Sequence, residues 1–515
     1  MLQITGNDLT VEQIIRVAFH DEIVELGTRA KKQVEESNSR LRENLHKDFP
    51  FYGINTGYGI FHNKKISHDQ LLALNRNLIL SHAVGVGTLF DEPTVRAALL
   101  IRANTLAKGF SGIRCLVIQT ILEMLNKKVT PQVCTQGSMG SSGDLCQLAQ
   151  VALVLTTDER NLDEESGSAC YMGEVMSGKD AMRAAGIERL ILQPKEGLAL
   201  INGATFSAAV GVIACWHARK LNDLADNNLA LALEALKGRK EAFDPRLHTA
   251  RGMEGQIETA RFVWDAVEGS QFVNSSTHVQ DGYALRCAPQ VHGAVKDTLT
   301  HAENVLTKEI NAATDNPLIF ENGDVLSGGN FHGEPIAFVM DFLGIALSEL
   351  GAIAERRIFR LLDSNLNNGL PIMLIAEQDK LGIESGLMIP QYSAASLVME
   401  NQQLANSDAV HSIPTSANQE DHNANSLTAA RHTALIVENV LRILTIELYT
   451  CAHALDIRMK QEPHKNMAGR TMETYKKVRG IVDFIEHDTL WGEEINKLFV
   501  FLKEEIIKIE SINGD

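Results

Sequence analysis

Long stretches in which apolar residues recur at helical spacing constrain the fold of this chain most strongly. The clearest stretch runs from Val291 to Ile310, where the apolar side chains keep to one face while Lys296 and Asp297 fall on the other. Strand-like alternation is sparse. Helices that outlast the diameter of one domain predict a mainly α-helical bundle whose apolar faces continue into neighbouring subunits. Similar runs cover 335–363, 386–407 and 420–460, and the segment after Asp488 is also helical and charged.

The pattern changes near residue 203, and at 515 residues the chain can bury a large core. Thr10 and Gln13 have capping-box spacing ahead of a first helix, and glycine-rich loops cover 52–59 and 132–143. We therefore predict a mixed N-terminal domain over 1–203, which carries both loops. A helical domain over 204–515 would hold the long bundle and the C-terminal helices.

The charge balance limits the partners of the chain. It has 48 basic and 65 acidic residues, a formal net charge of -17, which argues against nucleic acid or an anionic membrane surface. A small zwitterionic substrate remains compatible with this charge. The most apolar run, from Leu198 to Cys215, is interrupted by Asn202 and Gly203, so we predict a buried core segment rather than a membrane span.

The cysteines and histidines indicate neither disulfides nor a metal site. The seven cysteines are odd in number, widely spaced and never in a Cys-x-x-Cys pair. His422 and His432 lack ligand spacing, and no His-Glu-x-x-His motif is present. The N-terminus lacks the basic start and apolar run of a signal peptide. These features predict a protein of the reducing cytoplasm.

The most informative motif runs from Gly137 to Leu145 and reads Gly-Ser-Met-Gly-Ser-Ser-Gly-Asp-Leu. A glycine-rich segment is most often simply a flexible loop. This one does not fit a phosphate-binding loop, because no Gly-Lys-Ser/Thr follows and Asp144 stands where an anion would need a cation. It does not fit a nucleophile elbow either, since the Gly-x-Ser-x-Gly pattern fails at Asp144.

The Ser-Gly-Asp-Leu core of this motif resembles the signature of the histidine and phenylalanine ammonia-lyase family, and the resemblance covers most of the chain. In that family the glycine nitrogen attacks the carbonyl of the residue two before it, and two waters leave to give a methylidene-imidazolone group. The resemblance implies that Ser141, Ser142 and Gly143 form this group here. Ser141, Gln147 and Gln150 stand where the family usually has alanine, usually proline and often histidine.

The residue types suit that cyclisation. Glycine lets the backbone approach itself closely, and the central serine supplies the methylidene carbon by losing its hydroxyl. The first residue contributes mainly its carbonyl, so a serine at position 141 should be tolerated. Such a group is needed because eliminating ammonia from an α-amino acid removes a weakly acidic β-proton and expels a poor leaving group. No protein side chain is an electrophile of the required kind.

Three residues of the N-terminal domain fall where the family places parts of its active site. Tyr52 resembles the mobile-loop tyrosine that removes the β-proton, and because a phenol has a pKa near 10, we expect the fold to lower that pKa. His82 matches a position that selects the substrate in histidine-specific members; the alternative is a histidine satisfied in the core. Asn202 resembles the asparagine that hydrogen-bonds the prosthetic group, and its place in an apolar run predicts a buried, partnered amide.

The helical half supplies further matches. In Gln-Asp-Gly-Tyr-Ala-Leu-Arg-Cys, the resemblance makes Arg286 the clamp for the substrate carboxylate, with Gln280 and Tyr283 lining the site. A structural ion pair is the alternative for Arg286. Phe331 matches a phenylalanine beside the electrophile and Met388 a pocket methionine, although both also suit ordinary core packing.

Gln419 and Glu420 lie in Ser-Ala-Asn-Gln-Glu-Asp-His, which resembles the histidine-lyase form of the last family block. The glutamate of that block meets the imidazole of the substrate. Glu420 is the strongest indication of histidine, because a carboxylate accepts an imidazole N–H. Opposite a phenyl ring the same carboxylate would be a desolvated charge without a partner.

The resemblance implies the long-helix bundle of the ammonia-lyase and fumarase-like type, a homotetramer with active sites shared between subunits. It implies elimination of ammonia from histidine to give urocanate, with Tyr52 or Tyr283 taking the proton. Phenylalanine or tyrosine as substrate, an aminomutase reaction, and a catalytically inactive scaffold stay open as alternatives. The fumarase and argininosuccinate-lyase superfamily has a Met-Pro-x-Lys-x-Asn continuation that this chain lacks.

Overall fold

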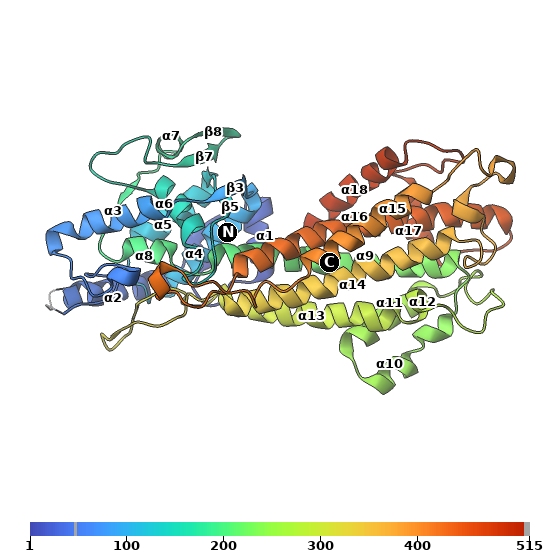
Figure 1. Ribbon diagram of the computed structural model, residues 1–515, viewed down its shortest axis with the longest axis horizontal. Coiled ribbons are helices and arrows are strands. Elements are labelled where there is room, and N and C mark those ends of the chain that lie inside the picture. Colours follow the sequence, from blue (N-terminus) through green and yellow to red (C-terminus); the bar gives the residue numbers. More distant parts are fainter. Residues whose placement is uncertain (46–48, 509–515) are drawn as a thin grey trace. The chain divides into compact units, whose positions relative to one another are not determined.

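The computed structural model describes residues 1–45 and 49–508 and is mainly α-helical (Figure 1). The mainly helical fold predicted from the sequence is therefore confirmed. The predicted long runs are present as α13 (Ala288–Glu309), α14 (Glu334–Leu362), α15 (Met388–Leu404) and α16 (Ser426–Gln461), with α18 (Trp491–Ile507) in the charged C-terminal segment.

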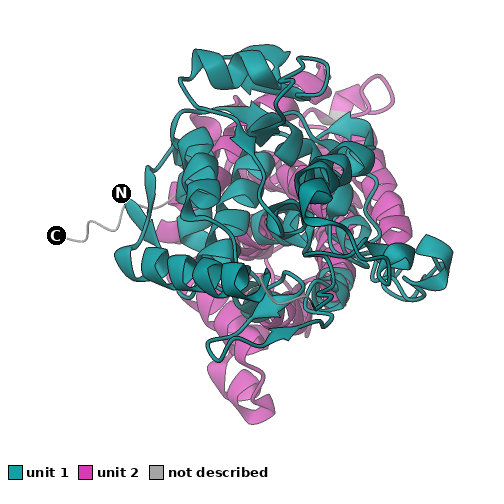
Figure 2. Ribbon diagram, turned by 90° about the vertical axis from the view of Figure 1, so that its left-hand side faces the viewer, with its two compact units in different colours: residues 1–214, 302–341, 407–431 teal, residues 215–301, 342–406, 432–515 magenta. Residues whose placement is uncertain are grey.

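The described chain falls into two compact units, which Figure 2 colours separately. Unit 1 comprises 1–214, 302–341 and 407–431, and unit 2 comprises 215–301, 342–406 and the chain from 432 onward. Helices α9 (Thr205–Ala235), α13, α14 and α16 contribute residues to both units. The units therefore interleave along the sequence, whereas the sequence predicted two consecutive domains, 1–203 and 204–515. That division into domains stays a prediction.

Unit 1 combines short helices with small sheets. Its helices are α1 (Val11–His20), α2 (Thr28–Leu45), α3 (Leu71–His82), α4 (Glu92–Ala107), α5 (Cys115–Asn126), α6 (Leu145–Leu155), α7 (Gly178–Ala184) and α8 (Glu196–Ile201). Parallel strand pairs are β1 (Leu2–Ile4) with β2 (Val24–Leu26), and β6 (Thr156–Thr157) with β9 (Leu190–Ile191). Antiparallel sheets are β3 (Val86–Leu89) with β5 (Cys134–Gln136), β4 (Thr130–Pro131) with β7 (Ser168–Tyr171) and β8 (Glu174–Ser177), and β10 (Leu318–Ile319) with β11 (Val325–Leu326).

Local sequence explains where helices of unit 1 begin. The capping box predicted before α1 is confirmed, because Thr10 Oγ1 accepts from the Gln13 backbone N at 3.2 Å and Gln13 Oε1 accepts from the Thr10 N at 2.9 Å. Asp91 caps α4 in a similar way, accepting from the Thr94 N at 3.1 Å. Every residue of α4 from Thr94 to Ala107 is buried, so this helix runs through the core of unit 1.

The apolar run from Leu198 to Cys215 is a buried segment, as predicted. It is not one helix, because α8 ends at Ile201 and α9 begins at Thr205. By length and composition, α14 is the one helix among the described residues that could cross a membrane, with a mean hydropathy of 1.9 over its most apolar 18 residues. However, 61% of that stretch is buried inside the protein, and the core helix of a soluble protein meets the same test.

A buried network of charges connects four long helices within unit 2. Arg357 donates to Glu447 through Nε, and through Nη2 at 3.2 Å, while its Nη1 lies 3.3 Å from His292 Nε2. Because arginine can only donate, His292 Nε2 accepts and its Nδ1–H donates to Asp226 at 2.8 Å. Asp226 also pairs with Lys296 at 2.8 Å. Paired charges of this kind tolerate burial. The other helices of unit 2 are α10 (Pro245–Arg251), α11 (Glu254–Ala266), α12 (Tyr283–Arg286), α15, α17 (Gly469–Arg479) and α18.

A buried histidine gives unit 2 a pH-dependent stability. His453 is 2% exposed, and its Nε2 lies 3.2 Å from the Leu374 carbonyl oxygen. Burial, together with the charges of Arg479 and Lys460, lowers the pKa of His453 to about 4. In the unfolded chain a histidine titrates near pH 6.5, so the stabilisation is present in full above about pH 6.5 and is lost as the pH falls toward 4. The pKa difference corresponds to about 3 kcal/mol.

We expect the free energy of unfolding to fall between about pH 7 and pH 4.5, and His453 to account for roughly 2–3 kcal/mol of the fall. The measurement is urea unfolding followed by tryptophan fluorescence, since the Trp491 ring lies 5.9 Å from His453. His453→Gln is the matched variant, because the amide can still donate to the Leu374 carbonyl but does not titrate. An equal pH dependence in both proteins would rule out His453 as the source.

Candidate active site

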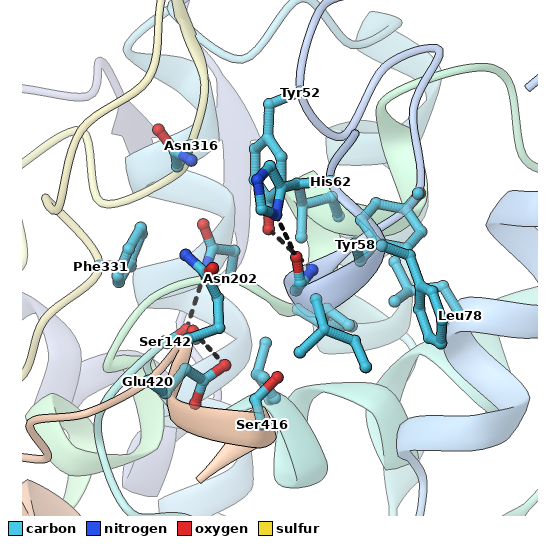
Figure 3. Close-up of a pocket in the computed structure, with 18 of the residues that line it drawn as sticks. Tyr52, Tyr58, His62, Leu78, Ser142, Asn202, Asn316, Phe331, Ser416 and Glu420 are labelled. Atoms are coloured by element: carbon cyan, nitrogen blue, oxygen red, sulfur yellow. Dashed lines mark hydrogen bonds between the residues drawn. The ribbon is translucent and has the colours of Figure 1, made fainter. Parts of the chain in front are cut away.

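A cavity of about 1270 Å³ in unit 1 collects segments that are far apart in the sequence. Figure 3 shows Tyr52 pointing into it from one side, while Ser142, Asn202 and Glu420 lie together across from that side chain. The predicted site residues that line this cavity are Tyr52, His82, Ser141, Ser142, Asn202, Phe331, Gln419 and Glu420.

The backbone at Gly143 is packed directly against the backbone at Gly203. Gly143 has a left-handed φ of 77°, and the two glycines form a β-bridge in which the Asp144 N donates to the Gly203 carbonyl at 2.9 Å. A Cβ at position 143 would lie 2.0 Å from the Gly203 carbonyl carbon. Only glycine therefore fits at position 143, on grounds of both conformation and space.

Asp144 fixes the segment that contains Ser142 and Gly143 through hydrogen bonds. Its carboxylate is fully buried and accepts hydrogen bonds from Ser138 Oγ at 2.7 Å, from Ser207 Oγ at 3.0 Å and from the Ser207 N at 2.8 Å. Burial raises the pKa of Asp144, and these hydrogen bonds oppose the rise. The Ser207 N lies in the first turn of α9, where an acidic side chain is favourable. Ser142 and its neighbours are thus held on a fixed support.

Two donors converge on the carbonyl oxygen of Ser142. Asn202 Nδ2 lies 2.8 Å from it and the Gly203 N lies 3.2 Å from it. The Asn202 amide is therefore buried, as predicted, and its nitrogen has a hydrogen-bond partner. Asn202 Oδ1 is buried and has no hydrogen-bond partner among the described residues, which leaves one acceptor beside the cavity. An arrangement of two donors on one oxygen stabilises negative charge there.

Arg102 holds Asn202 in place, and the sequence analysis missed it. The guanidinium is buried and donates to the backbone carbonyls of Asn202 and Ala199, each at 2.7 Å. A cation at these last carbonyls of α8 is favourable to the helix dipole. Burial lowers the pKa of Arg102 to about 10, so it remains charged at neutral pH. A cation within the apolar run Leu-Leu-Ile-Arg-Ala was the signal that could have identified it.

Glu420 is presented by a strained turn. Ser416, Ala417 and Asn418 all have positive φ, between 50° and 65°, and backbone hydrogen bonds between Thr415 and Glu420 close the turn. Three successive non-glycine residues in this region cost stability and are typical of functional sites. The turn lies against the Tyr52 loop, since a Cβ on Gly59 would lie 2.9 Å from Ser416 Oγ.

The carboxylate of Glu420 binds both serines of the central motif. Ser141 Oγ donates to Oε2 at 2.7 Å and Ser142 Oγ donates to Oε1 at 3.1 Å. Thr415 Oγ1 is farther from Oε2, at 3.5 Å. The residues predicted to form the prosthetic group and the residue predicted to meet the substrate ring are therefore in direct contact.

Tyr52 is half-buried, and its hydroxyl oxygen lies 3.4 Å from the Gly59 N. The pKa of Tyr52 is raised, mainly by burial and also by the negative charge of Glu420, while the Gly59 hydrogen bond opposes the rise. The prediction that the fold lowers the Tyr52 pKa is therefore wrong for the described chain. The nearby charge that acts on this phenol is the negative charge of Glu420, whereas a positive charge would be needed to lower the pKa.

His82 and Phe331 also line the cavity. His82 ends α3, its Nδ1 lies 2.9 Å from Ser81 Oγ, and burial lowers its pKa so that the ring is neutral at pH 7. Phe331 precedes His332, whose ring stacks on His422 at 5.9 Å. These two side chains therefore add a neutral imidazole and a phenyl ring to the lining of the cavity.

Gly143 is not among the lining residues but directly follows Ser142, and four further predicted site residues do not line this cavity: Gln280, Tyr283, Arg286 and Met388. All four belong to unit 2. Tyr283 is 69% exposed, and Arg286 lies over its ring at 4.4 Å while donating to the Asp281 carbonyl at 2.9 Å. Among the described residues Arg286 forms no ion pair, so the alternative of a structural ion pair is not observed. Its role and those of the other three stay predictions.

The two glutamines that replace the usual family residues have a structural explanation. Gln150 Oε1 accepts from the Cys134 N at 2.9 Å, and Gln147 Nε2 donates to the Cys134 carbonyl at 3.2 Å. Together these hydrogen bonds join α6 to strand β5, the two elements that follow and precede the motif in the sequence. A proline at position 147 could not make this contact.

Among residues 1–45 and 49–508, no group of three or more His, Cys, Asp or Glu side chains could hold a metal ion.

Comparison with known proteins places this geometry in context. The model of the aromatic amino acid lyase family matches residues 9–480. A histidine ammonia-lyase of Clostridium tetani is 46% identical over 488 residues, which cover 94% of this chain and 92% of that protein. The structure of histidine ammonia-lyase from Trypanosoma cruzi has a TM-score of 0.88 at 33% identity, covering 98% of this chain and 94% of that one. The tyrosine aminomutase of Streptomyces globisporus has a TM-score of 0.91 at 33% identity, with 98% and 97% covered.

Proposed function

The chain belongs to the aromatic amino acid lyase family, and from that premise we propose that it is a histidine ammonia-lyase. It is a carbon–nitrogen lyase that removes ammonia from L-histidine without oxidation and releases urocanate. The observation that carries the choice of histidine is the Glu420 carboxylate, which contacts Ser142 in a cavity lined by uncharged His82 and Phe331. An imidazole N–H gives this carboxylate a partner, which a phenyl ring cannot do.

The backbone geometry supports the proposal that Ser141, Ser142 and Gly143 form a methylidene-imidazolone group. For ring closure the Gly143 nitrogen bonds to the Ser141 carbonyl carbon, and that carbonyl oxygen leaves as water with the amide protons of Ser142 and Gly143. The Ser142 hydroxyl leaves as a second water with the Ser142 Cα proton. The left-handed Gly143 and the support beneath it favour the tight turn that this closure requires. The group supplies an electrophilic carbon, which no ordinary side chain offers.

The residues around this segment have distinct tasks. Asn202 Nδ2 and the Gly203 N are placed to stabilise negative charge on the Ser142 carbonyl oxygen. The unpartnered Asn202 Oδ1 is available to accept from the ammonium group of the substrate. Tyr52 takes the β-proton, Glu420 accepts the imidazole N–H, and Gln419 and His82 line the binding site. Phe331 lines the cavity and would pack beside the prosthetic group.

The substrate carboxylate requires a cation. We assign this task to Arg286, with Gln280, Tyr283 and Met388 beside the substrate and Tyr283 assisting proton transfer. Arginine suits the task because its planar fork binds both carboxylate oxygens. In a homotetramer with shared active sites, other copies of the chain would supply these residues. We place the enzyme in the cytoplasm, where its partners are the other copies of the chain and a small amino-acid substrate.

The direct test is incubation of the purified protein with L-histidine while the ultraviolet absorbance of the conjugated imidazole acrylate is followed. Growth of that absorbance supports the proposal, and the mass of the active-site peptide provides a second readout. A peptide about 36 Da lighter than its sequence has lost two waters. Full unmodified mass with no product would contradict the proposal and favour an inactive scaffold.

Aminomutase or phenylalanine and tyrosine lyase activity is the second candidate, which the likeness to the tyrosine aminomutase of Streptomyces globisporus favours. Parallel incubations with phenylalanine and tyrosine separate the cases. An arylacrylate without urocanate would transfer the assignment to another substrate, and a β-amino acid found by NMR would identify an aminomutase.

A further inference from the structure

Ser141 has a side chain that cyclisation does not consume. Of the three residues in the segment, Ser142 loses its hydroxyl and Gly143 has no side chain, whereas Ser141 contributes its carbonyl. Ser141 is 8% exposed, and its hydroxyl donates to Glu420 Oε2 at 2.7 Å. The alanine that the family usually carries at this position could not make that hydrogen bond.

Ring closure changes the hydrogen bonding of Glu420 unequally. Before closure, Oε1 accepts from Ser142 Oγ at 3.1 Å and Oε2 accepts from Ser141 Oγ at 2.7 Å. The Ser142 hydroxyl then leaves as water, so Oε1 becomes free while Oε2 keeps its donor. Thr415 Oγ1, at 3.5 Å from Oε2, is too distant to replace a short charge-assisted bond.

We propose that Ser141 is a positioning residue that fixes the Glu420 carboxylate in the mature enzyme and aims Oε1 at the imidazole N–H of the substrate. The inference rests on the proposed function and names what determines its specificity. A free glutamate side chain retains considerable rotamer freedom, which binding would have to remove. Ser141 removes that freedom in advance, and the turn from Thr415 to Glu420 holds the backbone of the same residue.

The test compares wild type with Ser141→Ala and Ser141→Thr. We expect the Ala variant to form the prosthetic group completely, with the same loss of about 36 Da. Its kcat/KM for histidine should fall roughly ten-fold, mainly through a higher KM, because the lost contact orients a binding group. The Thr variant, which keeps the hydroxyl, should recover most of that loss. An unchanged KM in the Ala variant would overturn the inference, as would an Ala variant that fails to cyclise.

A double-mutant cycle ties the effect to Glu420. In the Glu420→Gln background, Ser141→Ala should cost less than about two-fold, because the carboxylate that Ser141 positions is already gone. A full ten-fold loss in that background would show that Ser141 acts elsewhere. Failure of the proposed function would be visible separately, because wild-type protein carrying the group would then leave histidine unconsumed.

Discussion

Ser142→Ala is expected to lower turnover of histidine by more than about a thousand-fold while the fold stays intact. The Ser142 hydroxyl is the only source of the methylidene carbon's double bond, since its loss with the Cα proton creates that bond. Alanine has no leaving group at this carbon. Its methyl group still fits, because the contacts that hold the segment come from the Ser142 backbone carbonyl and from Asp144.

Peptide mass separates this explanation from misfolding. Wild type should show the loss of two waters, about 36 Da, whereas Ser142→Ala can lose at most the one water of ring closure, about 18 Da. Ser141→Ala is the matched control, because it removes the neighbouring hydroxyl and leaves the methylidene carbon, so it should keep the full mass loss. Turnover by Ser142→Ala at a rate similar to that of Ser141→Ala would contradict the proposed electrophile.

The sequence predicted which residues meet at the cavity better than it predicted how they are held. Ser142, Asn202 and Glu420 are far apart in the chain, yet each was identified from a short motif, and the structure brings them within hydrogen-bonding distance. Long helices were equally predictable, because their apolar spacing repeats over many turns. A motif records chemistry that requires particular residue types, and helical periodicity records burial.

The supports of the site could not be predicted because they depend on contacts between distant segments. The apolar run around Arg102 marks a buried cation, but its partners are the backbone carbonyls of Ala199 and Asn202, which no sequence pattern connects to it. The positive φ values at Ser416 and Ala417 occur in residue types that usually avoid them. The direction of the Tyr52 pKa depends on how deeply the loop is buried and on Glu420, neither of which is visible in the loop's own sequence.

Tyr52→Phe should lower kcat for histidine by about 10²–10⁴-fold, the range that a general base contributes, with a smaller change in KM. The substitution removes one oxygen atom whose described hydrogen bond is the 3.4 Å contact with the Gly59 N. Tyr58→Phe is the matched control on the same loop. Burial raises the pKa of Tyr58, and its hydroxyl has no hydrogen-bond partner among the described residues, so its loss should change kcat only a few-fold.

The pH dependence of kcat/KM in wild type, Glu420→Gln and Tyr52→Phe identifies the base. Because burial and the Glu420 charge raise the Tyr52 pKa, the phenolate needed for proton removal forms only as the pH rises, so kcat/KM of wild type should increase above neutral pH. Glu420→Gln removes a negative charge that opposes the phenolate. The increase should therefore move to lower pH in this variant, although its rate is lower at every pH because the imidazole acceptor is lost. An alkaline increase that stays in place in Glu420→Gln, or that survives in Tyr52→Phe, would assign proton removal to another group, of which Tyr283 is the first candidate.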